Sequence, residues 1–410
     1  MRALVTVAIA VVACTAPPPT VATPTPTPEP GVLTVTALLD LSGPRASVGT
    51  QQRTALQMWT EQPGRAGPAV KLRTVDVAGS DAKLLIELRR AVTEDPADAV
   101  IVGAPVVYDD TLGRALDVAA LPVVFTQPLG GDPRPHPGGR WAFALAPSLA
   151  QIATWQIDDA LRRSVLVPSL VLTDGRDRIE PMASALAAEL ERRRLDPLPV
   201  IRLETDGSIP PVVRSSLSVL QSVHCLAPVS VCSAVAREAR SRGSSTMVYL
   251  PYLTTPSEVR DDRDLSARAI WPSSRTLIPL TTLRDPWEHE RAGFLKRFGE
   301  RGNAWPGVHA ATAYDALSLL AAAADPRAID DRAALRDALE RITMPLIAST
   351  YAFSADRHLG ADPEDLAYVH WNGSVAFAPT FGTVAPTPTP SPTPTPSPTH
   401  PASPSPSAVP

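Results

Sequence analysis

The stretch VLTVTALL at Val32–Leu39, followed by DLSGPRASVG at 40–49 and an apolar helical pattern that reaches Trp59, decides the fold. A strand that is apolar on both faces, followed by a glycine-bounded turn and a helix, predicts the opening of a parallel α/β sheet. Ligands of such sheets lie at the carboxyl ends of the strands, so Leu41–Pro44 occupies the first position at which a ligand could be met. Gly43 and Pro44 also suit a tight turn with no ligand, and both interpretations stay open.

Residues 1–30 carry signals for export and not a fold. Arg2 precedes an apolar run over 3–13 that is too short to span a bilayer, which needs about 20 residues. The junction VVAC at 11–14 looks like the lipobox of a bacterial lipoprotein, which predicts that residues 1–14 are a signal peptide with its lipobox and that Cys14 becomes the lipidated N-terminus. A buried structural cysteine is the alternative, and it fits poorly inside an export signal. Several acyl chains on one cysteine would hold the protein at a membrane stably.

Two segments rich in proline and hydroxyl residues flank the body, at 15–30 and at 380–410. They hold almost no charge and few large apolar side chains, so neither can bury a core, and both are expected to stay extended and solvated. We expect the first to be a spacer that separates a lipid anchor from the folded body. The second is expected to be a disordered tail.

The body, about residues 31–379, is long enough for two lobes with separate cores. Apolar periodicity predicts strands after the first one at 70–77, 99–102, 121–126, 165–172, 200–203, 223–226 and 246–250. It predicts helices at 82–93, 110–119, 149–162, 180–194, 212–219, 231–242, 288–301, 308–324 and 331–342. This alternation predicts parallel sheets with right-handed crossovers. Asn372-Gly373 predicts a two-residue hairpin near the end of the body.

The sequence carries no constellation that supports catalysis or metal binding. Its seven histidines are scattered and form no i, i+4 pair with a carboxylate. The spacing of Asp356, Asp362 and Asp365 misses the calcium-loop pattern, which favours a solvated acidic turn. Ser42 lacks the Gly-x-Ser-x-Gly setting of a hydrolase nucleophile, and no glycine-rich phosphate loop appears. We therefore expect no enzyme activity, no metal and no cofactor.

Five motifs follow one another in order along the body: LSGP at 41–44 with Gly49, VIVG at 100–103, LPVVFT at 121–126, AREARSRG at 236–243 and AYDAL at 313–317. With these motifs the body resembles the type I periplasmic solute-binding proteins, specifically the leucine/isoleucine/valine receptors of ABC importers. The resemblance implies an α/β fold of two Rossmann-like lobes with parallel central sheets joined by three crossovers. These crossovers are expected near Ala146, Trp271 and Pro345. Lobe one would be 31–146 with 272–345, and lobe two 147–271 with 346–379.

Departures from the family bear on the ligand. Members that bind amino acids usually hold the α-ammonium and α-carboxylate with small hydroxyl residues in the loops that here follow Gly103 and Phe125. The first loop reads APVVYDD at 104–110, and the second keeps Thr126 but continues QPLGG. In lobe two, CLAPVS at 225–230 lacks the family's tyrosines. The resemblance therefore implies the scaffold but not the amino-acid site, and free leucine, isoleucine and valine are expected to bind weakly.

Residues at strand carboxyl ends are the ones expected to meet a solute: Ser42, Tyr108, Thr126 and Gln127 from lobe one, with Asp174, Ser230 and Tyr252 from lobe two. The hydroxyls of Ser42 and Thr126 suit a carboxylate or an amide. The two tyrosines suit an apolar or ring-bearing body. For Asp174 two roles stay open, a contact with a cationic or hydroxyl group and a turn with Gly175.

Two functions of different class are compatible with these patterns. The first is an extracytoplasmic, lipid-anchored binding protein, expected to be a monomer. It would capture a small polar or amphipathic solute, such as an amino-acid-like compound or derivative, and deliver it to an ABC permease in the membrane. The second is a lipid-anchored sensory or structural module with the same fold and no transport role. A net charge of −4 and a pI near 6.0 give no basic surface for nucleic acid.

Cys225 and Cys232 are expected to form a disulfide. Once Cys14 is lipidated they are the two cysteines that remain, and an exported chain lies in an oxidising compartment. Cys225 falls near the end of an expected strand and Cys232 in the first turn of the next helix, so their Cα atoms can approach. Two separate buried thiols are the alternative.

Overall fold

The computed structural model describes residues 31–62, 67–174, 180–204, 206–252, 254–274, 288–302, 305–326, 329–371 and 376–377. The chain divides into two compact units, Met1–Ala378 and Pro379–Pro410, and all described residues belong to the first. Cys14, both proline-rich segments and the expected turn Asn372-Gly373 lie outside the described residues.

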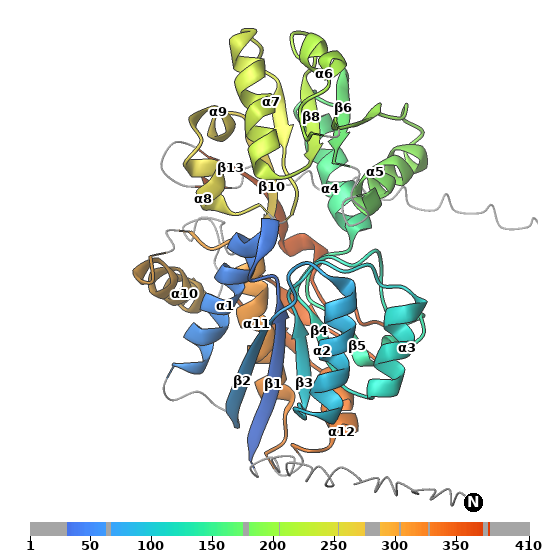
Figure 1. The fold of residues 1–410 in the computed structure, drawn as a ribbon, viewed down its shortest axis with the longest axis vertical. Helices are drawn as coiled ribbons and strands as arrows, with labels where there is room; N and C mark the ends of the chain where they lie inside the picture. The colour runs from blue at the N-terminus through green and yellow to red at the C-terminus, as the bar shows by residue number, and fades with distance from the viewer. Residues whose placement is uncertain are drawn as a thin grey trace, which may run out of the picture. The chain divides into compact units, whose positions relative to one another are not determined.

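The first sheet has five parallel strands in the order β2-β1-β3-β4-β5. Its strands are β1 (Val32–Leu39), β2 (Ala69–Asp76), β3 (Ala99–Val102), β4 (Val123–Phe125) and β5 (Ala142–Ala144). The helices that follow the first three strands are α1 (Ala46–Thr60), α2 (Asp81–Thr93) and α3 (Asp110–Ala119). We call this sheet and the elements packed on it lobe one (Figure 1).

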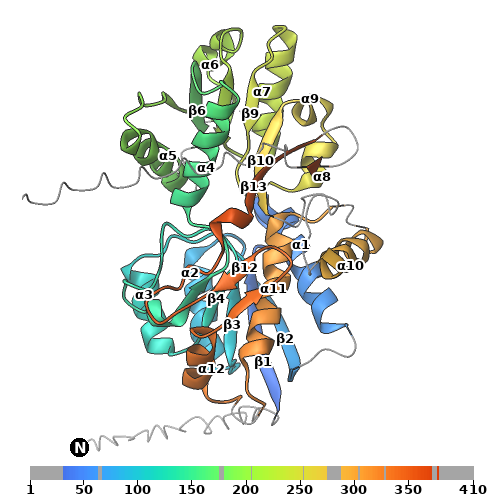
Figure 2. The ribbon, with the colours of Figure 1, turned by 180° about the vertical axis from the view of Figure 1, so that it is seen from behind.

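Alternate residues of β1 enter two different cores. Leu33, Val35, Ala37 and Leu39 pack with α1 and with helix α11 (Val308–Ala323), which lies over the face of the sheet seen in Figure 2. Leu38 points the other way and packs with α2 and α3, which cover the face seen in Figure 1. The period of two along a strand thus explains why this segment is apolar on both faces.

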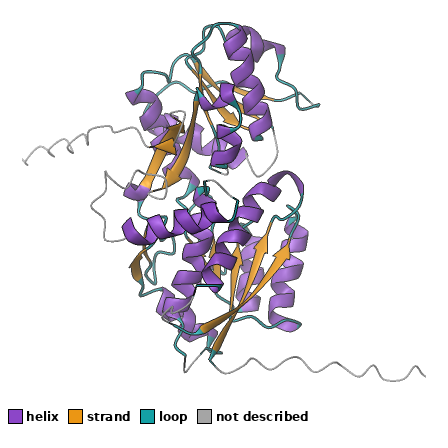
Figure 3. Ribbon diagram, turned by 90° about the vertical axis from the view of Figure 1, so that its left-hand side faces the viewer, coloured by secondary structure: helices purple, strands orange, loops and turns teal. Residues whose placement is uncertain are grey.

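The second sheet has seven strands in the order β14-β13-β10-β9-β8-β6-β7, and we call it and its helices lobe two. Five strands run parallel: β6 (Ser169–Thr173), β7 (Val200–Arg202), β8 (Ser222–Leu226), β9 (Met247–Tyr249) and β10 (Ala269–Ser274). Strand β13 (Leu366–Trp371) pairs antiparallel with β10 and with β14 (Ala376–Phe377), and the pairing of Trp371 with Ala376 leaves four residues between these strands where a two-residue turn was predicted. The helices are α4 (Leu149–Arg162), α5 (Glu180–Arg192), α6 (Pro211–Ser216), α7 (Val229–Ser241), α8 (Pro256–Arg260) and α9 (Arg263–Ser266). Figure 3 shows strands between helical layers in both lobes.

The remaining described elements return to lobe one. Besides α11, they are α10 (Glu288–Glu300), α12 (Arg332–Leu339) and the hairpin of β11 (Thr343–Pro345) and β12 (Thr350–Ala352). Within the described residues, no helix is long and apolar enough to cross a membrane. The same residues contain no group of three or more His, Cys, Asp or Glu side chains that could hold a metal ion.

The α/β alternation read from the sequence is confirmed, with one helix start and several short elements wrong. Helix α1 begins at Ala46, directly after a 3-10 turn at Gly43–Arg45, so Gly49 lies inside the helix and not in a loop. A Cβ at Gly49 would come within 1.9 Å of the Asp40 carbonyl oxygen, so glycine allows the close approach of helix and loop. The elements missed were α8, α9, β5, β10 and the two strands β11 and β12.

The last crossover from lobe one to lobe two lies later in the chain than we expected. Ile347, Tyr351 and Phe353, which we placed in lobe two, pack in the core of lobe one. Residues 346–361 are therefore corrected to lobe one, and the chain passes to the second sheet between Ala361 and β13. The reason is Asp315 of α11, whose buried carboxylate accepts hydrogen bonds from the backbone N–H groups of Ile347 and Ala348 at 3.0 and 2.8 Å.

Candidate ligand-binding site

A cavity of about 240 Å³ lies between residues of lobe one and residues of lobe two. Its walls come from loops at the carboxyl ends of β3, β4 and β9, from the last residue of β8, and from the first turns of α4 and α5. Lobe one contributes residues 105–108, 128, 130–133 and 136, and lobe two contributes 149, 152, 156, 181, 182, 226, 250–252 and 272. This is the edge at which parallel sheets present ligand sites.

Most of these side chains are apolar, and the polar ones are largely engaged by the protein. Asp132 accepts from the backbone N–H groups of Arg134 and His358 at 2.9 and 3.1 Å. Gln156 bonds through its amide nitrogen to Nδ1 of buried His224, and its oxygen accepts from the Tyr368 hydroxyl at 3.3 Å. The cavity therefore offers few free hydrogen-bonding groups.

The two tyrosines of the site differ in what their hydroxyls do. Tyr108 donates to the carbonyl of Pro137 at 2.9 Å, and its ring meets Phe125 edge-on at 6.1 Å between centroids. Tyr252 is 6% exposed, and its hydroxyl has no hydrogen-bond partner among the described residues. Burial raises the pKa of Tyr252, and the negative charge of Asp315 raises it further, so this hydroxyl stays protonated. Its side chain lines this cavity and also a second, smaller one beside Thr312 and Tyr351, so its hydroxyl is a candidate partner for a bound molecule or a water.

Ser42 does not line the cavity. Its exposed hydroxyl donates to Asp76 at 2.6 Å, and the other Asp76 oxygen accepts from the backbone of Leu41 and Ala78. Asp76 thus holds the loop after β1 together with the loop after β2. The tight-turn interpretation of Leu41–Pro44 is the one that this hydrogen bonding favours.

Thr126 and Gln127 are buried behind the cavity wall. The Thr126 hydroxyl accepts from the Gln52 amide at 3.1 Å, and its backbone carbonyl accepts from the Thr312 hydroxyl, so the side chain joins the end of β4 to α1 and the carbonyl joins it to α11. Gln127 is 1% exposed, and its amide has no partner among the described residues. Neither residue lines the cavity. The first residue after β4 that does is Pro128.

The two remaining candidates of lobe two also stand outside the cavity walls. Ser230 is exposed in the first turn of α7. Asp174 directly follows β6 and donates its backbone N–H to the Leu226 carbonyl, while the next five residues lie outside the described part of the chain. A ligand contact by Asp174 stays a prediction.

Sequence reasoning missed the apolar majority of the site. Ile152 and Met182 lie on helices, where an apolar residue indicates a core face as readily as a cavity wall. The prolines shortly after β3, β4 and β9 could have indicated an apolar site. A strand-end loop that meets a ligand usually offers backbone N–H groups, and a proline offers none.

Comparisons with known proteins were made at the level of families, sequences and structures. No family model matches the chain, and no curated protein matches it. Solved structures do match, among them an extracellular ligand-binding receptor from Rhodopseudomonas palustris with a TM-score of 0.70 and 17% identity, covering 86% of this chain and 100% of that one. The chain has the type I periplasmic-binding-protein fold.

Two further structures of this fold are described as complexes with a small molecule. The branched-chain amino acid transporter substrate-binding protein LivJ from Streptococcus pneumoniae, in complex with isoleucine, matches with a TM-score of 0.68 and 15% identity over 85% of this chain and 99% of that one. An ABC transporter solute-binding protein from R. palustris, in complex with benzoate, matches with a TM-score of 0.68 and 16% identity. The match covers 85% of this chain and 95% of that one. These two neighbours are described as solute- or substrate-binding proteins of transporters.

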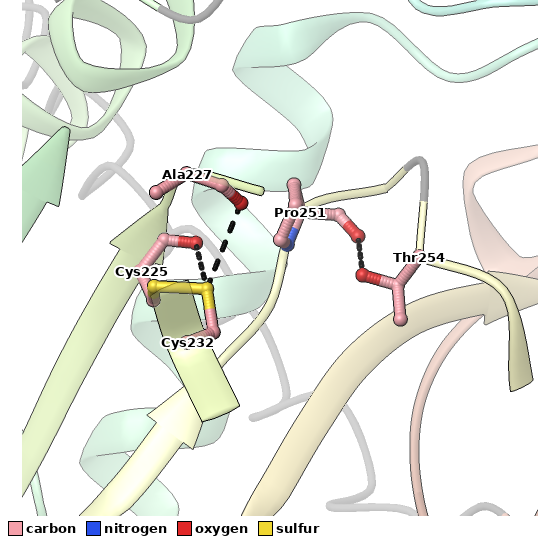
Figure 4. The surroundings of a disulfide bond; sticks show 5 residues. All are labelled: Cys225, Ala227, Cys232, Pro251 and Thr254. Atoms are coloured by element: carbon pink, nitrogen blue, oxygen red, sulfur yellow. Dashed lines mark hydrogen bonds between the residues drawn. A yellow bond between two sulfur atoms is a disulfide. The ribbon is translucent and has the colours of Figure 1, made fainter. Parts of the chain in front are cut away.

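In this periplasmic-binding-protein fold, Cys225 and Cys232 form a disulfide that joins the end of β8 to the start of α7, with Cα atoms 5.9 Å apart (Figure 4). Sγ of Cys232 lies 3.6 Å from the carbonyl oxygens of Cys225 and Ala227. Because a disulfide sulfur carries no hydrogen, these are contacts here and become hydrogen bonds only in the reduced thiol. The bond fixes the loop that follows Leu226, a residue of the cavity wall.

Replacing both cysteines by serine is expected to lower the free energy of unfolding by roughly 2–3 kcal/mol, because the bond closes a short loop in the unfolded chain. Urea unfolding of the variant and the unaltered protein measures the difference. Thiol titration of the unaltered protein in denaturant without reductant is expected to find neither thiol free. Two free thiols would contradict the pairing.

The stability of this binding-protein fold is expected to fall as the solution becomes acidic, because two histidines are buried uncharged. Burial lowers the pKa of His224 to about 3 and that of His309 to about 3, from a usual value of 6.5. The unfolded chain therefore takes up these protons below pH 6.5 while the folded chain does not, and stability is lost as pH falls from 6.5 toward 3. Each histidine accounts for a loss on the order of 1 kcal/mol between pH 7.5 and 5.5.

Urea unfolding at the two pH values measures this loss. His309→Gln should reduce the pH dependence, whereas His289→Gln, at an exposed position on α10, should leave it unchanged. Equal stability at both pH values would show that these histidines are not buried uncharged.

Proposed function

We propose that the protein is the extracytoplasmic solute-binding component of an ABC importer. It binds a small molecule in the cavity between its lobes and delivers the molecule to a permease in the membrane. The observation that carries the proposal is the cavity itself, which both lobes wall off at the carboxyl ends of their parallel strands. The neighbours of the same fold, described as ligand-binding receptors and as complexes with isoleucine and benzoate, support it.

Capture depends on a molecule that touches both lobes at once. Tyr108 belongs to lobe one and Tyr252 to lobe two, and both line the cavity. Contacts that exist only when both lobes engage the solute shift the population toward a closed state, and this shift is what a permease can recognise. A closed, loaded receptor is thereby distinguished from an empty one.

The experiment that tests the proposal is calorimetric titration of ligand-free protein with a panel of amino acids, amides, short peptides and aromatic acids. Dissociation constants in the micromolar range, about −8 kcal/mol, are expected for at least one member of the panel. Leucine, isoleucine and valine are expected to bind weakly, because the described residues that line the cavity include no serine or threonine. If no compound of the panel binds, and no molecule binds from cell extract, the result would favour a sensory or structural module instead.

We further propose that Cys14 anchors the protein to the membrane through acyl chains. The support is the small-residue junction VVAC at 11–14 after a short apolar run. The mass of the mature protein is expected to equal that of the chain from Cys14 with its lipid, and Cys14→Ala should abolish the acyl mass and release the protein from membranes. A wild-type mass without acyl groups would contradict the anchor.

A further inference from the structure

We infer that the cavity takes an uncharged, mainly apolar molecule about the size of a ring with a short substituent, and not an amino acid or another ion. The inference rests on the proposed function, since it names the class of solute for the same cavity. Three features of the walls carry it: the loss of N–H donors, the absence of a cation, and a single free hydroxyl.

Proline replaces N–H donors where an anion would be held. Loops after parallel strands and the first turns of helices bind carboxylates and phosphates through backbone N–H groups. In this cavity Pro105 follows β3, Pro128 follows β4 and Pro251 follows β9, while Pro181 occupies the second position of α5. Proline has no N–H to donate, so each of these positions presents a ring to the ligand. Both lobes thereby lose a backbone donor at these four positions, and in lobe one the donors that remain at the walls are those of residues such as Gly130 and Gly131.

No compensating positive charge is present among the described residues that line the cavity, which include no lysine or arginine. The only carboxylate there is Asp132, which repels an anion and already accepts two backbone N–H groups. An ion that enters these walls loses its hydration without gaining a full set of partners, which is strongly unfavourable. An uncharged apolar molecule incurs no such penalty and gains from the burial of its surface.

The buried polar contact that remains is the hydroxyl of Tyr252, which has no partner among the described residues, and exposed His136 adds a ring 6.1 Å from that of Tyr108. A buried hydroxyl without a partner is unfavourable, and a ligand oxygen or nitrogen that meets it removes that cost. The cavity of about 240 Å³ is larger than the engineered cavity of about 150 Å³ that binds benzene. It therefore has room for a ring together with one polar substituent.

Calorimetric titration with three compounds of nearly the same shape tests the charge of the ligand. Benzamide is uncharged, benzoate is an anion and benzylamine is a cation at pH 7.5. In the unaltered protein benzamide is expected to bind at least about tenfold more tightly than benzoate, which meets no lysine or arginine among the described walls. It is also expected to bind more tightly than benzylamine, whose carboxylate partner in these walls, Asp132, already accepts two backbone N–H groups.

Two tyrosine variants test the polar contact. Tyr252→Phe is expected to weaken benzamide about three- to tenfold, the value of one hydrogen bond. Tyr108 lines the same cavity, but its hydroxyl already donates to the carbonyl of Pro137. Tyr108→Phe is therefore expected to change the affinity less than about twofold. Equal losses in the two variants would contradict the assignment of Tyr252.

The double variant Pro105→Ser, Pro128→Thr returns N–H and hydroxyl donors to lobe one and is expected to raise the affinity for benzoate relative to benzamide by about threefold or more. Pro210→Ala, just before α6 and outside the cavity, is the matched control and is expected to leave the ratio unchanged. Circular dichroism of each variant confirms that it is folded.

Tighter binding of benzoate, benzylamine or isoleucine than of benzamide by the unaltered protein would overturn the inference and still support the proposed function. Arg176 and Arg178 lie outside the described residues, so Arg176→Ala, Arg178→Ala would show whether they supply a charge for benzoate. If no compound binds up to millimolar concentration and no small molecule is retained from cell extract, both the inference and the proposed function fail.

Discussion

Replacing Gly130 with phenylalanine is expected to weaken solute binding at least about 100-fold, a loss of about 2.7 kcal/mol, with little change in the stability of the fold. Gly130 lines the cavity, and a Cβ built on it meets no atom within 4 Å, so the new ring has open space and creates no backbone clash. The ring occupies volume that a ligand needs. Titration of the variant with whichever compound the unaltered protein binds gives the loss.

A matched variant separates a block of the cavity from a general effect of an added ring. Val118→Phe places the same ring on α3, at a side chain that is 86% exposed and does not line the cavity. It is expected to leave the affinity unchanged. If Gly130→Phe binds as tightly as the unaltered protein, the ligand lies elsewhere.

Replacing Asp315 with alanine is expected to destabilise lobe one by about 3–5 kcal/mol, the range found when a buried charged partner is removed from a hydrogen-bonded set. Its fully buried carboxylate accepts from the backbone of Ile347 and Ala348 and from the Tyr351 hydroxyl at 3.0 Å. Alanine leaves these donors buried without a partner. The free energy of urea unfolding measures the loss.

The control is Asp337→Ala on α12, whose side chain is 44% exposed and pairs with Arg336. An exposed pair of this kind contributes about 0–1 kcal/mol, so the control is expected to stay close to the unaltered protein. A similar small effect for Asp315→Ala would show that the hairpin of β11 and β12 is not held by this carboxylate.

The long elements of the fold were predictable from the sequence because each carries its own apolar period. Strand β1 and helix α3 were predicted with the bounds that the structure shows. Strand β5 was missed because three residues, AFA, are too short to show a period of two. The place of residues 346–361 depends on the hydrogen bonds of Asp315, a tertiary contact that no local pattern contains.

The site was less predictable than the fold. Tyr108 and Tyr252 were expected to meet a solute; both line the cavity between the lobes, and their contact with a solute stays a prediction. Ser42 and Thr126 were expected there too, but their hydroxyls bond to Asp76 and Gln52. A sequence shows which hydroxyls lie near strand ends and does not show which of them the protein uses for itself. The apolar walls could not be predicted from the sequence, because residues that line a cavity and residues of a core share one composition.

The most direct test of the central claim, that the cavity between the lobes binds a small solute, is non-denaturing mass spectrometry of the protein after exposure to cell extract. The unaltered protein is expected to carry an added mass of one small molecule, and Gly130→Phe is expected to carry none. An added mass that is equal in both proteins, or absent from both, would contradict the claim.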